Sequence, residues 1–315
     1  MNRIKNLILE LNSRCNNNCV YCYIPESDRN YENAGLTAQF FKKVILEFRS
    51  MGVKNVDFTG GEPTLYKDLF ELVTFSKDAG FDNRTLVTNG RMLAYYAYCR
   101  KVINSGINRV VLPLNGSTKN IAEAVSRTPG SYAQTISAIK NTKKLGVELG
   151  ITTVVNALNY MDIPAIMGRS FGLGADFINI QFLLPYVIDK IVPCRKLPSG
   201  IIPKYSESVR QVKTGLDRFG SMIKVNVHFI PFCLMRGYEK YLHNDAFKFN
   251  RVAVNYRKYR YNIGEHLRMG SVRTSRCSGC PDAAECLGFF QSYSRELGIE
   301  DIMKECAGSA GDNMA

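Results

Sequence analysis

Histidine is scarce in this sequence, and long apolar runs are missing. The chain of 315 residues contains three histidines, none of them in the first two hundred positions. A closed zinc site in that part would therefore have to be built without imidazole ligands. No run of eighteen apolar residues occurs, and the N-terminus leads into a short apolar stretch without a signal-peptide core. We therefore expect a soluble, cytoplasmic protein with no membrane segment.

Acidic residues are fewer than basic ones. Lys and Arg number 41 against 28 Asp and Glu, which gives a formal net charge of +13. Between Arg236 and Arg276, ten basic residues stand beside three acids, so seven of the thirteen excess charges lie there, interleaved with seven aromatic residues. Basic side chains neutralise anions while aromatic rings stack. The segment is either a surface for an anionic partner or a solvated cationic face that balances negatively charged clusters.

Strand-like and helix-like periods alternate over the first 185 residues. We expect six strands at residues 4–11, 53–58, 85–88, 109–114, 148–155 and 176–183, with helices near 37–48, 65–79, 93–105, 131–145 and 162–171. Strands linked by helices predict an α/β fold with a parallel sheet, and in barrel-like sheets the chemistry gathers at the C-terminal ends of the strands.

The pattern changes after about residue 185, where prolines interrupt the chain. We divide the chain into a core (1–185), a linker and helix (186–222), a smaller cysteine-rich domain (223–306) and a tail (307–315) that we expect to be disordered. The cysteine-rich domain has few apolar runs, so bound metal is expected to supply the missing stability.

Three cysteines stand together directly after the first predicted strand. Cys15, Cys19 and Cys22 are spaced C-x3-C-x2-C. Iron–sulfur clusters prefer thiolate ligands, and three thiolates on a four-iron cube leave one iron open for a substrate or cofactor. Ordinary buried thiols and a zinc site are the alternatives.

Two glycines and an acid, Gly60, Gly61 and Glu62, follow the second predicted strand. Paired glycines let the backbone approach a ligand closely, although a turn alone would also explain them. The carboxylate is harder to explain by a turn, and it suits an ammonium group.

The cysteine triplet, with Tyr21 before its last member, and the Gly-Gly-Glu-Pro stretch together resemble the radical S-adenosylmethionine (SAM) superfamily. The resemblance implies a partial (β/α)6 barrel and a [4Fe-4S] cluster on Cys15, Cys19 and Cys22, whose open iron is chelated by SAM. It implies that Glu62 contacts the SAM amino group. Reductive cleavage of SAM would give a 5′-deoxyadenosyl radical that abstracts hydrogen, leading to oxidation, epimerisation or C–C bond formation. A flavodoxin- or ferredoxin-type protein would donate the electron.

Other strand-end residues are similar to cofactor-lining positions of that superfamily. The expected cofactor-binding set is Tyr21, Gly60, Gly61, Glu62, Asn89, Asn115, Arg127 and Asn156. Asn115 stands where many relatives have an acid, which puts a proton-transfer role there in doubt. A surface position is the alternative for Arg127. Thr153 and Gln181 are further candidates to face cofactor or substrate.

A second thiol group, Cys277, Cys280 and Cys286, has C-x2-C-x5-C spacing. It is similar to the auxiliary-cluster domains called SPASM and Twitch, with a zinc knuckle as the alternative. Phe290 occupies the position of a further SPASM cysteine, so the resemblance implies one auxiliary [4Fe-4S] cluster.

The fourth ligand of that cluster is either Cys233 or Cys306. We expect Cys233, because Pro231 restricts the backbone beside it and apolar neighbours would bury its thiol. Cys306 lies at the edge of the tail, which costs about 1–2 kcal/mol per residue to order. The spacing from Cys286 to Cys306 is nevertheless similar to that of SPASM ligands.

The substrate stays open at this level. Peptide-modifying relatives often carry a leader-binding domain before the barrel, whereas here the triplet begins at residue 15. We therefore expect a small anionic natural-product intermediate, such as a nucleotide, sugar or aminoglycoside precursor. A ribosomally made peptide is second and RNA third. A non-catalytic iron–sulfur redox scaffold would explain the thiols but not Glu62.

Overall fold

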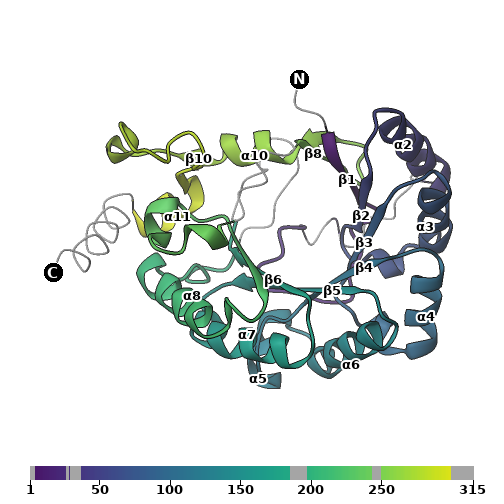
Figure 1. Ribbon diagram of the computed structural model, residues 1–315, viewed down its shortest axis with the longest axis horizontal. Coiled ribbons are helices and arrows are strands. Elements are labelled where there is room, and N and C mark those ends of the chain that lie inside the picture. The colour runs from purple at the N-terminus through teal and green to yellow at the C-terminus, as the bar shows by residue number, and fades with distance from the viewer. Residues whose placement is uncertain (1–3, 26–27, 29–36, 185–196, 243–249, 299–315) are drawn as a thin grey trace.

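The computed structural model describes residues 4–25, 28, 37–184, 197–242 and 250–298. Within them, nine strands form one sheet in the order β7-β6-β5-β4-β3-β2-β1-β8-β9. All neighbours from β7 to β8 are parallel, and β9 is antiparallel to β8. The sheet curves, and helices α2 to α7 lie on its outer side (Figure 1).

The strands of this sheet are β1 Ile4–Glu10, β2 Asn55–Thr59, β3 Asn83–Val87, β4 Arg109–Pro113, β5 Glu148–Val155, β6 Phe177–Phe182, β7 Lys224–His228, β8 Asn250–Val254 and β9 Arg260–Asn262. The helices are α2 Ala38–Ser50, α3 Leu69–Asp78, α4 Tyr96–Asn104, α5 Lys119–Ser126, α6 Ser131–Lys144, α7 Ile163–Gly172, α8 Tyr205–Phe219, α10 Ile263–Met269 and α11 Gln291–Leu297. A small antiparallel pair joins β10 Ser271–Val272 to β11 Phe289–Phe290.

The six strands and the α/β class expected from the sequence are confirmed, with β5 at the predicted bounds. Helix α5 and strands β8 and β9 were not predicted. The three residues of β9 are too few to show a periodicity, and β8 lies in the part of the chain with few apolar runs. The places of these two strands are decided by pairing, of β8 with β1 and of β9 with β8.

The main core lies between the sheet and the outer helices. Helix α2 shows how the sequence builds it, since Phe41, Val44, Ile45 and Phe48 recur at helical spacing and are all buried. Each fully buried apolar side chain of this size contributes about 1.5–3 kcal/mol. The apolar face of the helix therefore fixes it on the sheet.

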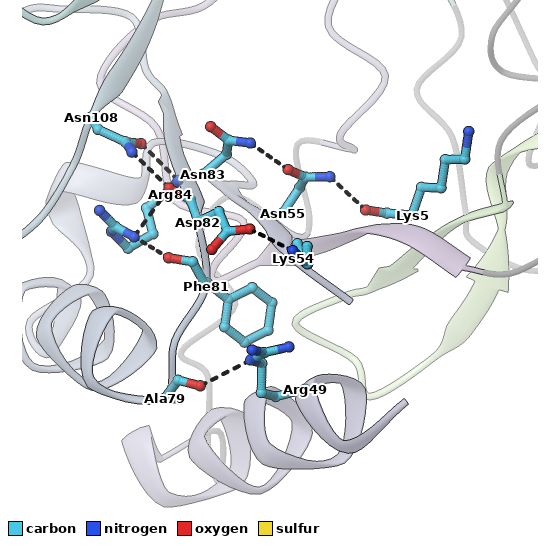
Figure 2. A network of polar contacts seen from close by, with 10 residues as sticks. All are labelled: Lys5, Arg49, Lys54, Asn55, Ala79, Phe81, Asp82, Asn83, Arg84 and Asn108. Carbon is cyan, nitrogen blue, oxygen red and sulfur yellow. Dashed lines mark hydrogen bonds and ion pairs between the residues drawn. The ribbon is translucent and has the colours of Figure 1, made fainter. Parts of the chain in front are cut away.

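Polar side chains join the amino ends of the first four strands (Figure 2). The Asn55 amide donates to the Lys5 carbonyl at 2.7 Å and accepts from the Asn83 amide at 2.6 Å. The backbone N–H of Arg84 donates to the Asn108 side chain at 2.8 Å. These contacts hold the N-terminal ends of the strands together. The predicted chemistry lies at the opposite edge of the sheet, at the C-terminal ends of the strands.

Later segments share the same sheet. β7 pairs with β6, α8 packs on α7, and β8 pairs with β1, so residues on both sides of positions 185 and 223 contribute to one sheet. The domain division stays a prediction, and the tail 307–315 lies outside the described residues. Among the described helices, none combines the length and the hydropathy needed to cross a membrane.

Candidate active site

A cavity of about 400 Å³ opens at the C-terminal ends of the parallel strands. Its lining residues come from the loop after β1, from the ends of β2 to β6 and the turns that follow them, from α5 and α6, and from the residue after β7. This is the edge at which the alternation of strands and helices predicted the site.

The loop after β1, residues 11–24, is called the cysteine loop below, and it brings three thiols to this cavity. Cys15, Cys19 and Cys22 all line it, and all three are half-buried free thiols. Burial raises the pKa of the Cys15 thiol, and the nearby Glu62 and Cys22 raise it further. No three His, Cys, Asp or Glu side chains in the described part of the chain converge on a single metal ion. A four-iron cluster instead presents a separate iron to each thiolate, and three thiols on an open cavity fit it.

Gly60 and Gly61 allow the turn after β2 to pack against the cysteine loop. Gly60 has φ +125°, and a Cβ there would lie 2.5 Å from the Asn12 carbonyl oxygen. A Cβ on Gly61 would lie 2.3 Å from the Arg14 carbonyl oxygen. The Gly61 N–H donates to the Asn12 carbonyl at 2.7 Å. The glycines line the cavity, and they are also required for this backbone contact.

Glu62 connects the ends of β2 and β3. Its carboxylate is fully buried and outside the cavity lining. Oε1 accepts the hydroxyls of Thr64 at 2.6 Å and Thr88 at 2.5 Å, and Oε2 accepts the Asn89 N–H at 2.8 Å. Burial raises the pKa of Glu62, while these hydrogen bonds act in the opposite direction. The carboxylate is thus already occupied by protein donors, and its contact with the SAM amino group stays a prediction.

Asn89 carries this connection to the cysteine loop. It lines the cavity, and its side-chain amide donates to the Asn16 side chain at 2.6 Å and to the Cys15 sulfur at 3.8 Å. The Arg91 guanidinium donates to the Asn16 carbonyl and, at 2.6 Å, to Gln134. Sequence reasoning missed Arg91, whose only signal is its place directly after the Thr88-Asn89-Gly90 stretch that follows β3.

Asn115 and Tyr21 meet on the other side of the loop. The Asn115 amide donates to the Tyr21 hydroxyl at 2.8 Å and accepts the Val154 N–H at 3.0 Å. Both predicted residues line the cavity. Burial raises the pKa of Tyr21 well above its usual value, and the neighbouring Cys19 thiol raises it further. An amide in place of the family's acid therefore joins the cysteine loop to β5.

Three predicted residues lie away from the cavity. Thr153 points to the opposite face of β5 from the lining residues Thr152 and Val154, because side chains alternate along a strand. Asn156 is fully buried and uses its side chain to hold the turn after β5. Arg127 is exposed at the C-cap of α5, in agreement with the alternative of a surface position.

Aromatic residues complete the wall. Gln181 lines the cavity as predicted, and beside it lie Phe182 and Phe229, which sequence reasoning missed together with Tyr132. Phe229 directly follows β7 and has φ +66°, a conformation that non-glycine residues rarely adopt. Its position after a parallel strand is the signal that could have found it.

Three arginines of the basic segment pair with acids far from it in the sequence. Arg251 lies 3.3 Å from Asp57, and Arg260 lies 2.5 Å from Glu47. Arg257 also pairs, at 2.6 Å from an Asp28 oxygen. These contacts favour the alternative in which the segment balances acidic side chains, because each of the three guanidiniums already has an anionic partner.

Two thiols lie near Cys286. Burial raises the pKa of the Cys286 thiol, as do the nearby thiols of Cys233 and Cys277. An ion pair of 2.7 Å between Arg236 and Asp282 joins the segment after Cys233 to the loop between Cys280 and Cys286. Cys233 thus lies near Cys286, while Cys306 lies outside the described residues, and the choice of the fourth ligand stays a prediction.

A model of the radical SAM superfamily matches residues 9–169, just over half of the chain. The chain belongs to the radical SAM superfamily. It is accordingly an enzyme, and its cofactors are a [4Fe-4S] cluster and SAM.

Relatives in this superfamily differ in what their names say they act on. The chain is 31% identical over 180 residues to PqqA peptide cyclase of Bradyrhizobium diazoefficiens, covering 56% of this chain and 46% of the relative. It is 27% identical over 181 residues to a probable GTP 3′,8-cyclase of Methanocaldococcus jannaschii, covering 57% and 59%. The chain therefore spans about half the length of the curated relatives it matches.

Similarity to a solved structure extends over nearly the whole chain. That structure is native anSMEcpe with bound AdoMet and Cp18Cys peptide, with a TM-score of 0.68, 16% identity, and coverage of 97% of this chain and 96% of that one. At this identity the likeness establishes the shared fold alone. It extends across the C-terminal segment as well as the barrel.

Proposed function

We propose that this radical SAM enzyme modifies a peptide at an uncharged side chain. The observation that carries the proposal is the chemistry of the cavity wall, because none of the described residues that line it is Lys, Arg, His, Asp or Glu. An anionic group placed there would lose its hydration without gaining a counter-charge. A neutral side chain meets no such penalty.

The loop residues would hold the cofactors. Cys15, Cys19 and Cys22 would ligate the cluster, which when bound supplies the electron that cleaves SAM to methionine and a 5′-deoxyadenosyl radical. Asn89 and Asn115 hold the loop from its two sides. Their hydrogen bonds fix where the thiols stand relative to the cavity.

The far wall would orient the substrate and exclude water. Pro113, Val154, Phe182 and Phe229 present apolar surface to the cavity, and Gln181 offers one amide among them. Apolar surface favours an aliphatic or aromatic side chain. Excluding water and side reactants also protects a reactive radical.

A peptide substrate replaces the small anionic molecule that the sequence favoured. The PqqA peptide cyclase relative supports it, and so does the uncharged wall. The GTP cyclase relative supports the anionic alternative, which would need cations that the described wall does not offer. An early triplet is no argument against a peptide, because this chain spans only part of such relatives.

The second thiol group would hold one auxiliary [4Fe-4S] cluster. Cys233, Cys277, Cys280 and Cys286 are its proposed ligands, supported by the electrostatic coupling of Cys286 to two of the others. We also propose a cytoplasmic location and a flavodoxin- or ferredoxin-type donor. None of the eight cysteines within the described part of the chain is in a disulfide, as expected in a reducing compartment.

The test uses reconstituted enzyme, reductant and SAM with synthetic peptides encoded near the gene, and GTP in parallel. A peptide substrate should increase the formation of 5′-deoxyadenosine, and its own mass should change. GTP should neither increase 5′-deoxyadenosine formation nor be altered. The triple variant of Cys15, Cys19 and Cys22 to Ala is the control for non-enzymatic cleavage. Turnover of GTP with no change in any peptide would overturn the proposal.

A further inference from the structure

A hairpin near the end of the described chain reaches back to the cysteine loop. β8 lies beside β1 (Figure 1) and pairs with it in parallel, with Val254 opposite Leu9. The chain then turns into β9, which is antiparallel to β8. The turn at 255–259 therefore lies beside the C-terminal end of β1, where the cysteine loop begins. Residues more than two hundred positions apart are brought together there.

Asp28 joins the hairpin to the start of the loop. Its carboxylate is 2% exposed and accepts the Tyr256 hydroxyl at 2.8 Å and the Arg257 guanidinium at 2.6 and 3.1 Å. Its backbone carbonyl accepts the Ser13 hydroxyl at 2.5 Å. Ser13 lines the cavity two residues before Cys15.

Glu10 makes a second connection, at the other end of the loop. Its carboxylate is 8% exposed, and Oε1 accepts the Tyr261 hydroxyl of β9 at 2.8 Å. The same oxygen accepts the Tyr23 hydroxyl at 3.3 Å. Tyr23 directly follows Cys22 and lines the cavity. Both ends of the cysteine loop are thus held through buried acids.

The turn at 255–259 is held by hydrogen bonds of its own. Asn255 is fully buried, and its side-chain oxygen accepts the N–H groups of Arg257 at 2.9 Å and Tyr259 at 3.0 Å. Lys258 adopts the left-handed conformation with φ +66°. A local hydrogen-bonded turn of this kind offers Tyr256 and Arg257 in one orientation.

We propose that the β8–β9 hairpin positions the cluster-binding loop, with Arg257 and Tyr256 acting as positioning residues through Asp28. Without the guanidinium, the buried Asp28 carboxylate loses two hydrogen bonds and the positive charge of Arg257, which disfavours its present position. Ser13 and the start of the loop would move with it. The thiols would then stand in a less defined geometry around the cofactors.

The experiment measures SAM binding by reconstituted enzyme with Arg257→Met. Addition of SAM changes the EPR spectrum of the cluster that has the open iron, so titration of that change gives a Kd. We expect SAM binding to weaken roughly 10- to 100-fold, the usual cost of losing an outer-shell partner. Arg260→Met is the matched control. Arg260 lies on the same hairpin and forms an exposed ion pair with Glu47 of α2, so its loss should leave the Kd unchanged.

A double-variant cycle separates positioning from a general loss of stability. If Arg257 acts through Asp28, then Asp28→Asn with Arg257→Met weakens SAM binding no more than Arg257→Met alone. Fold-changes that multiply, or a wild-type Kd in Arg257→Met, overturn the proposal. If Arg257→Met fails to fold, Tyr256→Phe takes its place. That variant removes only the hydrogen bond from the Tyr256 hydroxyl to Asp28, and its Kd for SAM is interpreted in the same way. Weaker SAM binding with an unchanged thermal midpoint supports the role, and an unchanged Kd contradicts it.

Discussion

The Thr88 hydroxyl donates to Glu62 Oε1 at 2.5 Å, joining the end of β3 to the turn after β2. Both residues are buried, and Asn89 donates its N–H to the other carboxylate oxygen. The glutamate of the Gly-Gly-Glu turn is therefore a structural junction of two strands. It acts on the cysteine loop through Asn89, which reaches Asn16.

Glu62→Gln should destabilise this junction. The new amide group would face the Asn89 or threonine donors, and leaving one buried donor unpaired costs about 1–3 kcal/mol. Denaturant unfolding of the apo protein measures the loss. Glu71→Gln, which breaks an exposed ion pair to Lys42, is the control and should cost about 1 kcal/mol or less. Unchanged stability together with weaker SAM binding would instead favour direct contact of Glu62 with SAM.

Replacing Cys15, Cys19 and Cys22 together by Ala should halve the bound iron and abolish SAM cleavage. These thiols line the cavity, and we propose them as the ligands of the SAM-binding cluster. Iron analysis and 5′-deoxyadenosine formation under dithionite are the measurements. Cys99→Ala should retain all the iron, because Cys99 is buried in the core on α4. Full deoxyadenosine formation by the triple variant would contradict the assignment of these three thiols as cluster ligands.

Cys233→Ala should lose the iron of the auxiliary cluster, and Cys306→Ala should keep it. Cys233 lies close enough to Cys286 to raise the pKa of that thiol. Each variant is reconstituted separately and its iron is counted. About eight irons per chain in Cys233→Ala, with loss in Cys306→Ala, would reverse the assignment.

Glu10 should give the apo protein a stability that falls as pH rises. Burial raises the pKa of this carboxyl above its ordinary 4.5, against the opposing hydrogen bonds of Tyr261 and Tyr23. Between 4.5 and the raised pKa the folded state binds more protons than the unfolded chain, so stability decreases through that interval and stays lower above it.

Glu10→Gln should remove this contribution. The free energies of unfolding of wild type and variant, measured across that interval, should diverge in favour of the variant as pH rises. Tyr261→Phe removes a hydrogen bond that lowers the pKa, so its stability should depend on pH more steeply than that of wild type. Parallel curves for wild type and Glu10→Gln would show that Glu10 titrates alike in both states.

Local patterns predicted much of the barrel. Alternating periods gave β5 at its observed bounds and located the edge that bears the cavity. The cysteine spacing and the paired glycines predicted the loop and the turn that pack together there, because both patterns act within a few residues.

Pairing between distant segments could not be predicted in this way. Thr153 was expected at the cavity and lies on the other face of β5, a one-residue difference that reverses side-chain direction. The sequence left open whether the basic segment binds an anionic partner or balances negative charge, and three of its arginines pair with Asp28, Glu47 and Asp57. Nothing local in the sequence assigns those partners.

The sequence by itself determined the family, the fold class and the thiols that face the cavity, since each depends on short-range periodicity or spacing. The tertiary structure decided that Glu62 is occupied by protein donors, that the described cavity wall is uncharged, and that Asp28 and Glu10 hold the cysteine loop. Those features arise only when the chain closes loops of up to 251 residues. Contacts at such separation leave no local pattern, because their partners are chosen by the packing of the whole sheet.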